Sequence, residues 1–74
     1  MIALLGRDSL NARRWALCHG LMPGEYVFFN YDNIYQMEIA NYTCDVVLVT
    51  PQFWEDDRAQ STYDRAIAKK HTHE

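Results

Sequence analysis

The sequence predicts one small α/β domain in which three strands alternate with three helices around a parallel sheet. Three short runs, residues 1–5, 26–29 and 45–50, are rich in the aliphatic, β-branched and aromatic side chains that favour strands. A segment that suits a helix follows each run, and this alternation favours a parallel sheet. Since the chain has only 74 residues, we expect a single domain over residues 1–70 and a flexible tail at 71–74.

Local signals define the first strand and the first helix. Residues 1–5 are all apolar, as in a strand that is covered on both faces, and Gly6 stops the run. Asp8 or Ser9 can cap the helix that follows, because a short side-chain oxygen there accepts a free backbone N–H. Gly20 suits the left-handed position after a helix, so this helix should end at about residue 19.

The middle of the chain predicts a second strand and a short helix. Aromatic and β-branched residues fill Tyr26–Phe29, and polar residues follow directly. Asp32 can cap a short helix from Ile34 to about Ile39. This helix would provide the crossover to the third strand.

The third strand and the final helix follow from a long aliphatic run and a charge pattern. Four consecutive aliphatic residues within Asp45–Thr50 predict a strand that is covered on both faces, and Pro51 ends it. The acids at 55–57 and the lysines at 69–70 suit the two ends of a helix dipole. Apolar positions of this helix recur at i, i+4, i+7 and i+8, so the packed face should consist of Ala59, Tyr63, Ala66 and Ile67.

The connections predict the order of the strands. We expect the order 2-1-3 with right-handed crossovers, and the alternative is 3-2-1 with all crossover helices on one face. In the order 2-1-3 the connections diverge between strands one and three. Ligands of open parallel sheets bind at such points, beyond the carboxyl ends of the strands.

That point would bring together two loops, Gly6–Ser9 and Thr50–Trp54. Arg7 and Ser9 are the candidate anion-binding residues, because Arg7 adds a positive charge beside the free N–H groups of a helix N-terminus. The glycine patterns of the P-loop and of the dinucleotide-binding turn are absent. Asp8, as a helix cap, would also place a carboxylate where a phosphate would bind, so we favour a plain cap.

We predict no catalytic residues, no cofactor and no metal. Cys18 and His19 are neighbours on a helix, so their side chains diverge by about 100° and do not form a nucleophile–base pair. His71 and His73 could bind a metal together with His19, but a pair so near a chain end is a poorly organised site.

Trp15 and the two cysteines are expected inside the domain. Trp15 should cover the sheet from the first helix, with Cys18 beside it. Cys18 and Cys44 form no CxxC pair, and no signal-peptide pattern precedes them. This pattern predicts buried free thiols in a cytoplasmic protein.

Charge and hydropathy limit the expected partners. The net charge is −3, and residues 21–57 contain seven acids and no lysine or arginine, so nucleic acid is not an expected main partner. Arg7, Arg13 and Arg14 could form a local basic spot. The longest apolar runs are too short to cross a bilayer, so we expect no membrane partner.

Aromatic residues exceed what three strands and three helices can enclose. Exposed aromatic patches typically mark protein interfaces. If the second strand lies at an edge, no proline or lysine protects its unpaired backbone groups. We expect self-association, with a dimer favoured, and a host protein as a further partner. The candidate interface residues are Tyr26, Phe28, Phe53, Trp54 and Tyr63.

The sequence also resembles a group of phage proteins. The segments that carry the resemblance are Ala-Arg-Arg-Trp-Ala at 12–16, Gly-Leu at 20–21, Pro-Gly-Glu-Tyr at 23–26 and Asp-Val-Val-Leu-Val-Thr at 45–50. They are similar to short orphan proteins encoded by phages of actinobacteria, and the resemblance covers most of the chain. It implies a reduced Rossmann-like or P-loop-like core and an accessory role in the cytoplasm of a bacterial host. It implies no activity and no catalytic residues.

These observations support three hypotheses of function. The leading one is a non-enzymatic phage accessory protein that acts as a homo-oligomeric protein-interaction module. The alternative is a reduced nucleotide- or phosphate-binding domain that uses Arg7, Ser9 and the helix N-terminus. The third is a weak nucleic-acid binder through Arg7, Arg13 and Arg14.

Overall fold

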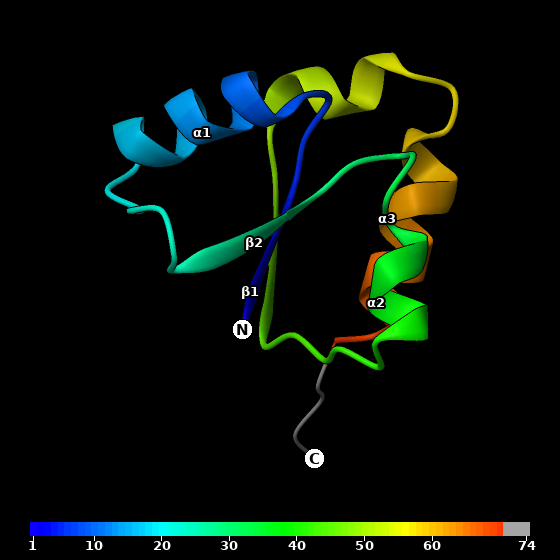
Figure 1. Cartoon of the computed structure of the whole chain (residues 1–74). Coiled ribbons are helices and arrows are strands. Elements are labelled where there is room, and N and C mark those ends of the chain that lie inside the picture. The colour runs from blue at the N-terminus through cyan, green and yellow to red at the C-terminus, as the bar shows by residue number, and fades with distance from the viewer. Residues whose placement is uncertain (71–74) are drawn as a thin grey trace.

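A three-stranded parallel sheet lies at the centre of the computed structural model, which describes residues 1–70 (Figure 1). The strands are β1 (Ile2–Leu5), β2 (Tyr26–Phe29) and β3 (Val46–Val49), in the order β2-β1-β3. The predicted fold class and strand order are confirmed, and the alternative order 3-2-1 is wrong. The predicted tail at 71–74 lies outside the described residues.

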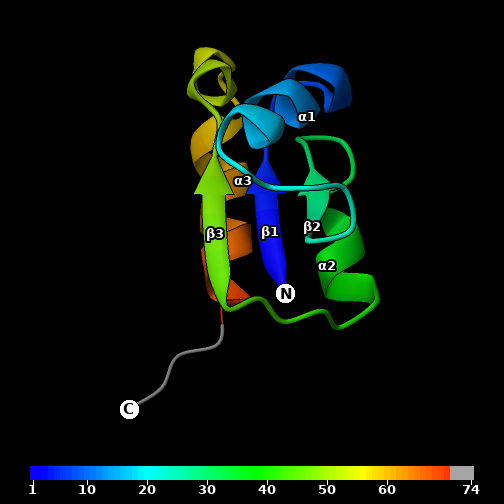
Figure 2. The ribbon, with the colours of Figure 1, turned by 90° about the vertical axis from the view of Figure 1, so that its left-hand side faces the viewer.

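The helices cover the two faces of the sheet unequally. One face carries α1 (Ser9–Cys18) alone, whereas α2 (Tyr35–Ile39) and α3 (Ala59–Ala68) lie together on the other face (Figures 1 and 2). A short 3₁₀ helix, η1 (Pro51–Glu55), follows β3 at the carboxyl end of the sheet. We call the two faces the α1 face and the α2/α3 face.

The predicted limits of α1 are confirmed. Asp8 is the N-cap, and its Oδ1 accepts a hydrogen bond from the backbone N–H of Asn11 at 2.8 Å. His19 is the C-cap, and Gly20 follows with a φ of 80°, the left-handed conformation that glycine adopts without steric cost. Both signals were local, so the sequence was sufficient to predict them.

The start of α2 differs from the prediction. Asp32 does not cap the helix. The Oδ1 of Asn30 instead accepts from the backbone N–H groups of Asp32 and Asn33, both at 2.9 Å. This Asx turn includes the residue that was expected to cap the helix, which starts at Tyr35, one residue later than predicted.

The start of α3 also differs, because the acids at 55–57 precede the helix instead of opening it. The carboxylate of Asp56 accepts from the backbone N–H of Arg58 at 2.8 Å and forms a local turn, so α3 begins at Ala59. The expected packed face is partly correct. Ala59 and Ala66 are buried, but Thr62 is 3% exposed and takes the place predicted for Ile67, which is 37% exposed.

The core has two parts, one on each face of the sheet. On the α2/α3 face, Ala3, Leu5 and Phe29 are at most 1% exposed and pack with buried residues of α2, η1 and α3. On the α1 face, Leu4 packs against Ala12 and Ala16 of α1. Only one helix covers this second face, so its core is smaller.

Three sequence expectations about burial need correction. Cys18 is exposed, because it lies off the Ala12–Ala16 stripe that faces the sheet. Trp15 packs against the α1 face as predicted, but it is only half-buried, and its ring stacks on His19 at a centroid distance of 4.1 Å. Val46 is 42% exposed, so β3 is not covered along its whole length on both faces. Cys44 is a buried free thiol, as predicted.

Candidate functional site

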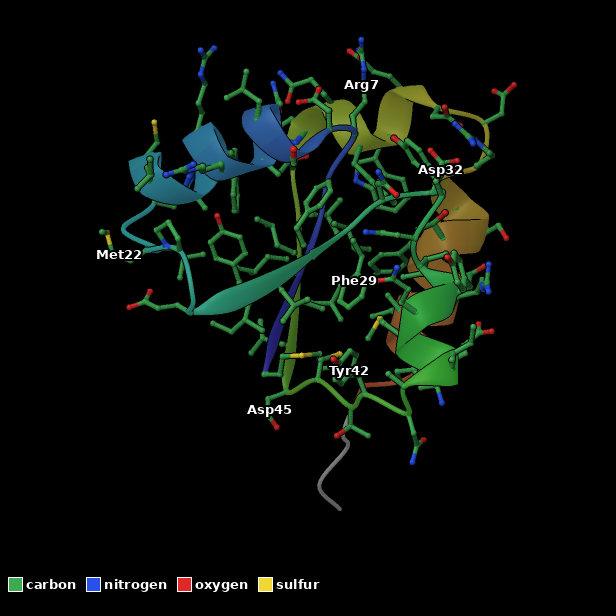
Figure 3. The ribbon with its side chains drawn as sticks, viewed as in Figure 1. Arg7, Met22, Phe29, Asp32, Tyr42 and Asp45 are labelled. Carbon is green, nitrogen blue, oxygen red and sulfur yellow. The ribbon has the colours of Figure 1, made fainter. Side chains whose placement is uncertain are left out.

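The loop after β1 lies next to the segment after β3 at the carboxyl end of the sheet, as the strand order predicts. Arg7 points away from the sheet there (Figure 3), and its Nη1 donates to Oε2 of Glu55 at 3.1 Å. Their side chains are 58% and 63% exposed. The charge that was predicted to attract an anion is therefore paired with a neighbouring carboxylate.

The N-terminus of α1 already interacts with an acidic side chain of the chain itself. The carboxylate of Asp8 accepts from the backbone N–H of Asn11, and the Asp8 carbonyl accepts from Ala12 at 3.0 Å. Ser9, the second candidate anion-binding residue, is exposed in the first turn. Arg7 and Ser9 thus flank Asp8, which caps the helix between them.

Beneath this loop, α1 packs closely on the sheet through Gly6. A Cβ atom at Gly6 would lie 2.9 Å from Cβ of Ala12 and 3.0 Å from Cε1 of Phe28, so the packing requires glycine. Oγ1 of Thr50 would lie 3.4 Å from the same Cβ atom at Gly6. This hydroxyl is buried without a hydrogen-bond partner among residues 1–70. Within that part of the chain no pocket is present.

A second candidate site is the uncovered half of the α1 face. Ile2 lies in register with Tyr26 on one side and Val46 on the other, so the three side chains form one row across the sheet. In Figure 2 the amino-terminal ends of β1 and β3 have no helix in front of them, because α1 lies near the carboxyl ends. Val46 is 42% exposed, and Ile2 and Tyr26 are half-buried.

The outer edge of β2 adjoins this row. The carbonyl of Phe29 accepts from the N–H of Gly6 at 3.1 Å, so the backbone groups of Phe29 point towards β1. Because these groups alternate along a strand, those of Val27 also point inwards, and those of Tyr26 and Phe28 point away from the sheet. In the described part of the chain, no strand lies beside β2 on that outer side.

The structure separates the predicted interface residues into two groups. Tyr26 and Phe28 lie on β2 and are half-buried on the α1 face. Trp54 is 48% exposed and contacts the half-buried Tyr63, with ring centroids 5.3 Å apart. Phe53 is 0% exposed, so its expected place at the surface is wrong.

The burial of Phe53 has a physical reason in the turn that precedes it. Pro51 begins η1, and the N–H of Phe53 donates to the carbonyl of Thr50 at 3.1 Å. This tight turn directs the ring into the core, where it stacks on Tyr31 at a centroid distance of 5.0 Å. Trp54, the next residue, points outwards.

Sequence reasoning missed a cluster around Arg58. Its guanidinium donates to Asp56 at 3.0 Å and to Asp32 at 3.1 Å, and lies 4.8 Å above the ring centroid of Tyr31. The hydrogen bonds from Arg58 lower the pKa of Asp56, whereas burial and then the charge of Asp56 raise the pKa of the Tyr31 hydroxyl. The Tyr31 hydroxyl donates to the carbonyl of Phe53.

This cluster connects the β2–α2 loop to the start of α3. Asp32 and Arg58 are 26 positions apart, so no local sequence pattern could have indicated their contact. The groups of the cluster bind one another, and we interpret it as a structural connection between two loops.

Over residues 1–70, no group of three His, Cys, Asp or Glu side chains is arranged to hold a metal. Within the same residues, no helix is long and apolar enough to cross a membrane. His71 and His73 lie outside the described part. No family model, no curated protein and no solved structure matches the chain.

Proposed function

We propose that this chain is a non-enzymatic protein-interaction module that works as a homodimer joined through its β2 edges. The observation that carries the proposal is the outer edge of β2, where the N–H and C=O groups of Tyr26 and Phe28 point away from the sheet. Proteins normally pair or protect such an edge. The four residues of β2 include no charge and no proline.

A two-fold axis at Val27 would satisfy these backbone groups. In an antiparallel pair centred on Val27, Tyr26 of one copy faces Phe28 of the other, and the two residues exchange both backbone hydrogen bonds. By symmetry, Phe28 of the first copy faces Tyr26 of the second, and this pair also exchanges two backbone hydrogen bonds. Two aromatic cross-strand pairs then lie on the α1 face, and such pairs stabilise a sheet.

The side chains at the axis also suit this arrangement. Val27 is 38% exposed and would face its own copy at a closely spaced position that does not exchange hydrogen bonds. A β-branched side chain packs well there. Isologous two-fold contacts are the commonest way in which a chain binds itself. The result would be a continuous six-stranded sheet.

The second edge of the sheet offers a matched comparison. β3 is also an outer strand, but the residues just before it, Cys44 and Asp45, bind other parts of the chain. The N-terminal amino group lies 2.8 Å from Oδ2 of Asp45, and the N–H of Cys44 donates to the carbonyl of Lys69 at 3.1 Å. Charge at Asp45 and Pro51 at the other end make β3 the less suitable pairing edge.

Light scattering across a dilution series tests the proposal. The wild type should show a dimer mass at high micromolar concentration and a monomer mass on dilution. Val27→Lys should raise the dissociation constant by at least about tenfold, because two ammonium groups would meet at the axis. Val46→Lys, at a similarly exposed position on β3, should leave the mass unchanged.

A mixture of variants makes the test more specific. Equimolar Val27→Lys and Val27→Glu chains should form a heterodimer, because opposite charges then face each other across the axis. A wild type that remains monomeric at high micromolar concentration would contradict the proposal. So would a dimer that Val46→Lys disrupts and Val27→Lys does not.

Anion binding at Arg7 and Ser9 is the second candidate, and one feature favours it. The N-terminus of α1 lies at the point where the chain connections diverge. It ranks below the dimer because Glu55 pairs with Arg7 and Asp8 caps the helix. Calorimetric titration of ATP or phosphate, with Arg7→Ala as the comparison, should give no heat at low salt for either chain.

The proposed setting of the module is the bacterial cytoplasm, in an accessory role during phage infection. The free thiols of Cys18 and Cys44 suit a reducing compartment. Fractionation of an actinobacterial host that expresses the tagged chain tests the location. Recovery in the secreted fraction would contradict it.

A further inference from the structure

The outward face of α1 has an unusual composition for the solvent side of a helix. Leu10 is 58% exposed and Leu17 is 47% exposed, whereas Ala12 and Ala16, which face the sheet, are at most 1% exposed. Seven positions amount to nearly two full turns, so Leu10 and Leu17 point in almost the same direction, about 10.5 Å apart along the axis. Two large apolar side chains of α1 thus lie on its solvent side.

Two arginines flank this pair of leucines. At about 100° per residue, Arg14 lies to one side of the Leu10–Leu17 line and Arg13 to the other. Both are exposed, and neither forms an ion pair within the described chain. The other three arginines, Arg7, Arg58 and Arg65, all have carboxylate partners. The positive charge that this protein leaves unpaired on arginine is concentrated on α1.

The position of α1 leaves this face accessible. α1 lies at the periphery, on the side of the sheet opposite to α2 and α3 (Figure 1). Its buried stripe packs on the sheet, and Leu10 and Leu17 on the opposite side stay exposed to solvent.

From this arrangement we propose that the outward face of α1 binds an acidic amphipathic helix of another protein. The partner would bring apolar side chains to Leu10 and Leu17, and carboxylates to Arg13 and Arg14. Apolar anchors at helical spacing are the usual contacts in recognition of one helix by another, and arginine is enriched at protein interfaces. The proposal is independent of dimerisation through β2.

Charge argues against a second copy of α1 as the occupant. A two-fold axis midway between Leu10 and Leu17 would pair each leucine with the other leucine of the second helix. The same axis passes between Arg13 and Arg14, so four guanidinium groups would gather near it. Like charges at such an interface disfavour the pairing, whereas carboxylates on a different partner favour it.

Synthetic helical peptides provide the test. A labelled peptide with leucines seven positions apart and flanking glutamates should bind, as measured by fluorescence anisotropy. A peptide with the same leucines and flanking lysines should bind at least about tenfold more weakly. A peptide with the glutamates but without the leucines should also bind at least about tenfold more weakly than the first peptide. Amide chemical-shift changes should concentrate at residues 9–18.

Charge reversal identifies the surface. Arg13→Glu/Arg14→Glu should invert the preference, so that the lysine peptide binds more tightly than the glutamate peptide. Lys69→Glu/Lys70→Glu changes the net charge by the same amount far from this face and should keep the wild-type preference. Circular dichroism should show that both variants are folded.

Three results would overturn the proposal. The first is equal binding of the two leucine peptides. The second is a preference that Lys69→Glu/Lys70→Glu inverts as well, which would indicate a general charge effect. The third is binding of a single-stranded oligonucleotide or of phosphatidylglycerol vesicles to residues 9–18 with no binding of the glutamate peptide. That result would identify a different class of partner.

Discussion

The two faces of the sheet use alternate residues of the same strands, yet they differ in how completely they are covered. On the α2/α3 face, Ala3, Leu5 and Phe29 are at most 1% exposed, and Phe53 and Cys44 complete a closed core. On the α1 face only Leu4 of the three strands is fully buried, and Val46 is 42% exposed.

The dimensions of helices and strands explain this difference. Adjacent strands lie about 4.8 Å apart and a helix with its side chains is about 10 Å wide, so one helix covers about two strands along only part of their length. Two helices cover most of a three-stranded face and leave Val27 at the β2 edge 38% exposed, whereas a single helix covers less. The α2/α3 face can therefore stabilise the fold, while the α1 face and the adjoining β2 edge keep surface that a partner can cover.

Truncation of Phe53 should have the largest effect and tests the closed face. Phe53→Ala removes a fully buried ring that contacts Tyr31 and Trp54, and should cost about 3–5 kcal/mol of unfolding free energy. Such a loss is a large part of the stability of any domain of this size. Urea unfolding followed by circular dichroism measures it.

Trp54 provides the control for that measurement. It is adjacent to Phe53 but 48% exposed, so Trp54→Ala should cost far less. Equal losses for the two variants would contradict the burial assigned to Phe53.

Truncation of Trp15 should have an intermediate effect and tests the open face. The ring is half-buried against the α1 face and stacks on His19, so Trp15→Ala should cost about 2 kcal/mol. The same urea titration applies. A loss as large as that of Phe53→Ala would show that the α1 face contributes as much to stability as the closed face.

Most of the fold could be predicted because its signals are local. The limits of β2 follow from aromatic residues between a proline–glycine break and polar residues, and the limits of α1 follow from Asp8 and Gly20. Errors arose where side chains formed turns that compete with helices. Asn30 and Asp56 bind nearby backbone N–H groups, and each delays the start of a helix.

The candidate site was less predictable, because exposure depends on packing between distant segments. The sequence indicated that β2 could be an unprotected edge, but Phe53 and Trp54 could not be distinguished before the turn at Pro51 was known. The outward position of Leu17 and the exposure of Cys18 likewise depend on which side of α1 meets the sheet. Alanines at 12 and 16 were the available signal, since their small side chains permit close packing.

The two cysteine thiols should differ in their rate of reaction. Cys18 is exposed on α1, whereas Cys44 is buried among residues of the α2/α3 core, and burial raises the pKa of its thiol. Reaction requires an accessible thiolate, so Cys18 should react with a disulfide reagent at least about tenfold faster than Cys44. Absorbance of the released thiol in Cys18→Ser and Cys44→Ser chains measures each rate. Similar rates at pH 8 would contradict the closed core.

The smallest expected effect concerns the outer side of the α2/α3 face, where Arg65 donates to both carboxylate oxygens of Glu38 at 2.7 and 3.0 Å. The hydrogen bonds from Arg65 lower the pKa of Glu38 below its ordinary value of 4.5. The folded chain therefore holds this carboxylate ionised more readily than the unfolded chain. The resulting stabilisation is present at pH values above the ordinary pKa and is lost as the pH falls through the lowered pKa.

Glu38→Gln should slightly lower the melting temperature at pH 7 and flatten the fall of that temperature between pH 5 and 3. Arg65→Gln should have the same effect, and the double variant should add little to either. Because the side chains of Arg65 and Glu38 are 40% and 46% exposed, 1 M salt should reduce the difference. An acid dependence that neither substitution changes would show that the α2–α3 ion pair does not contribute.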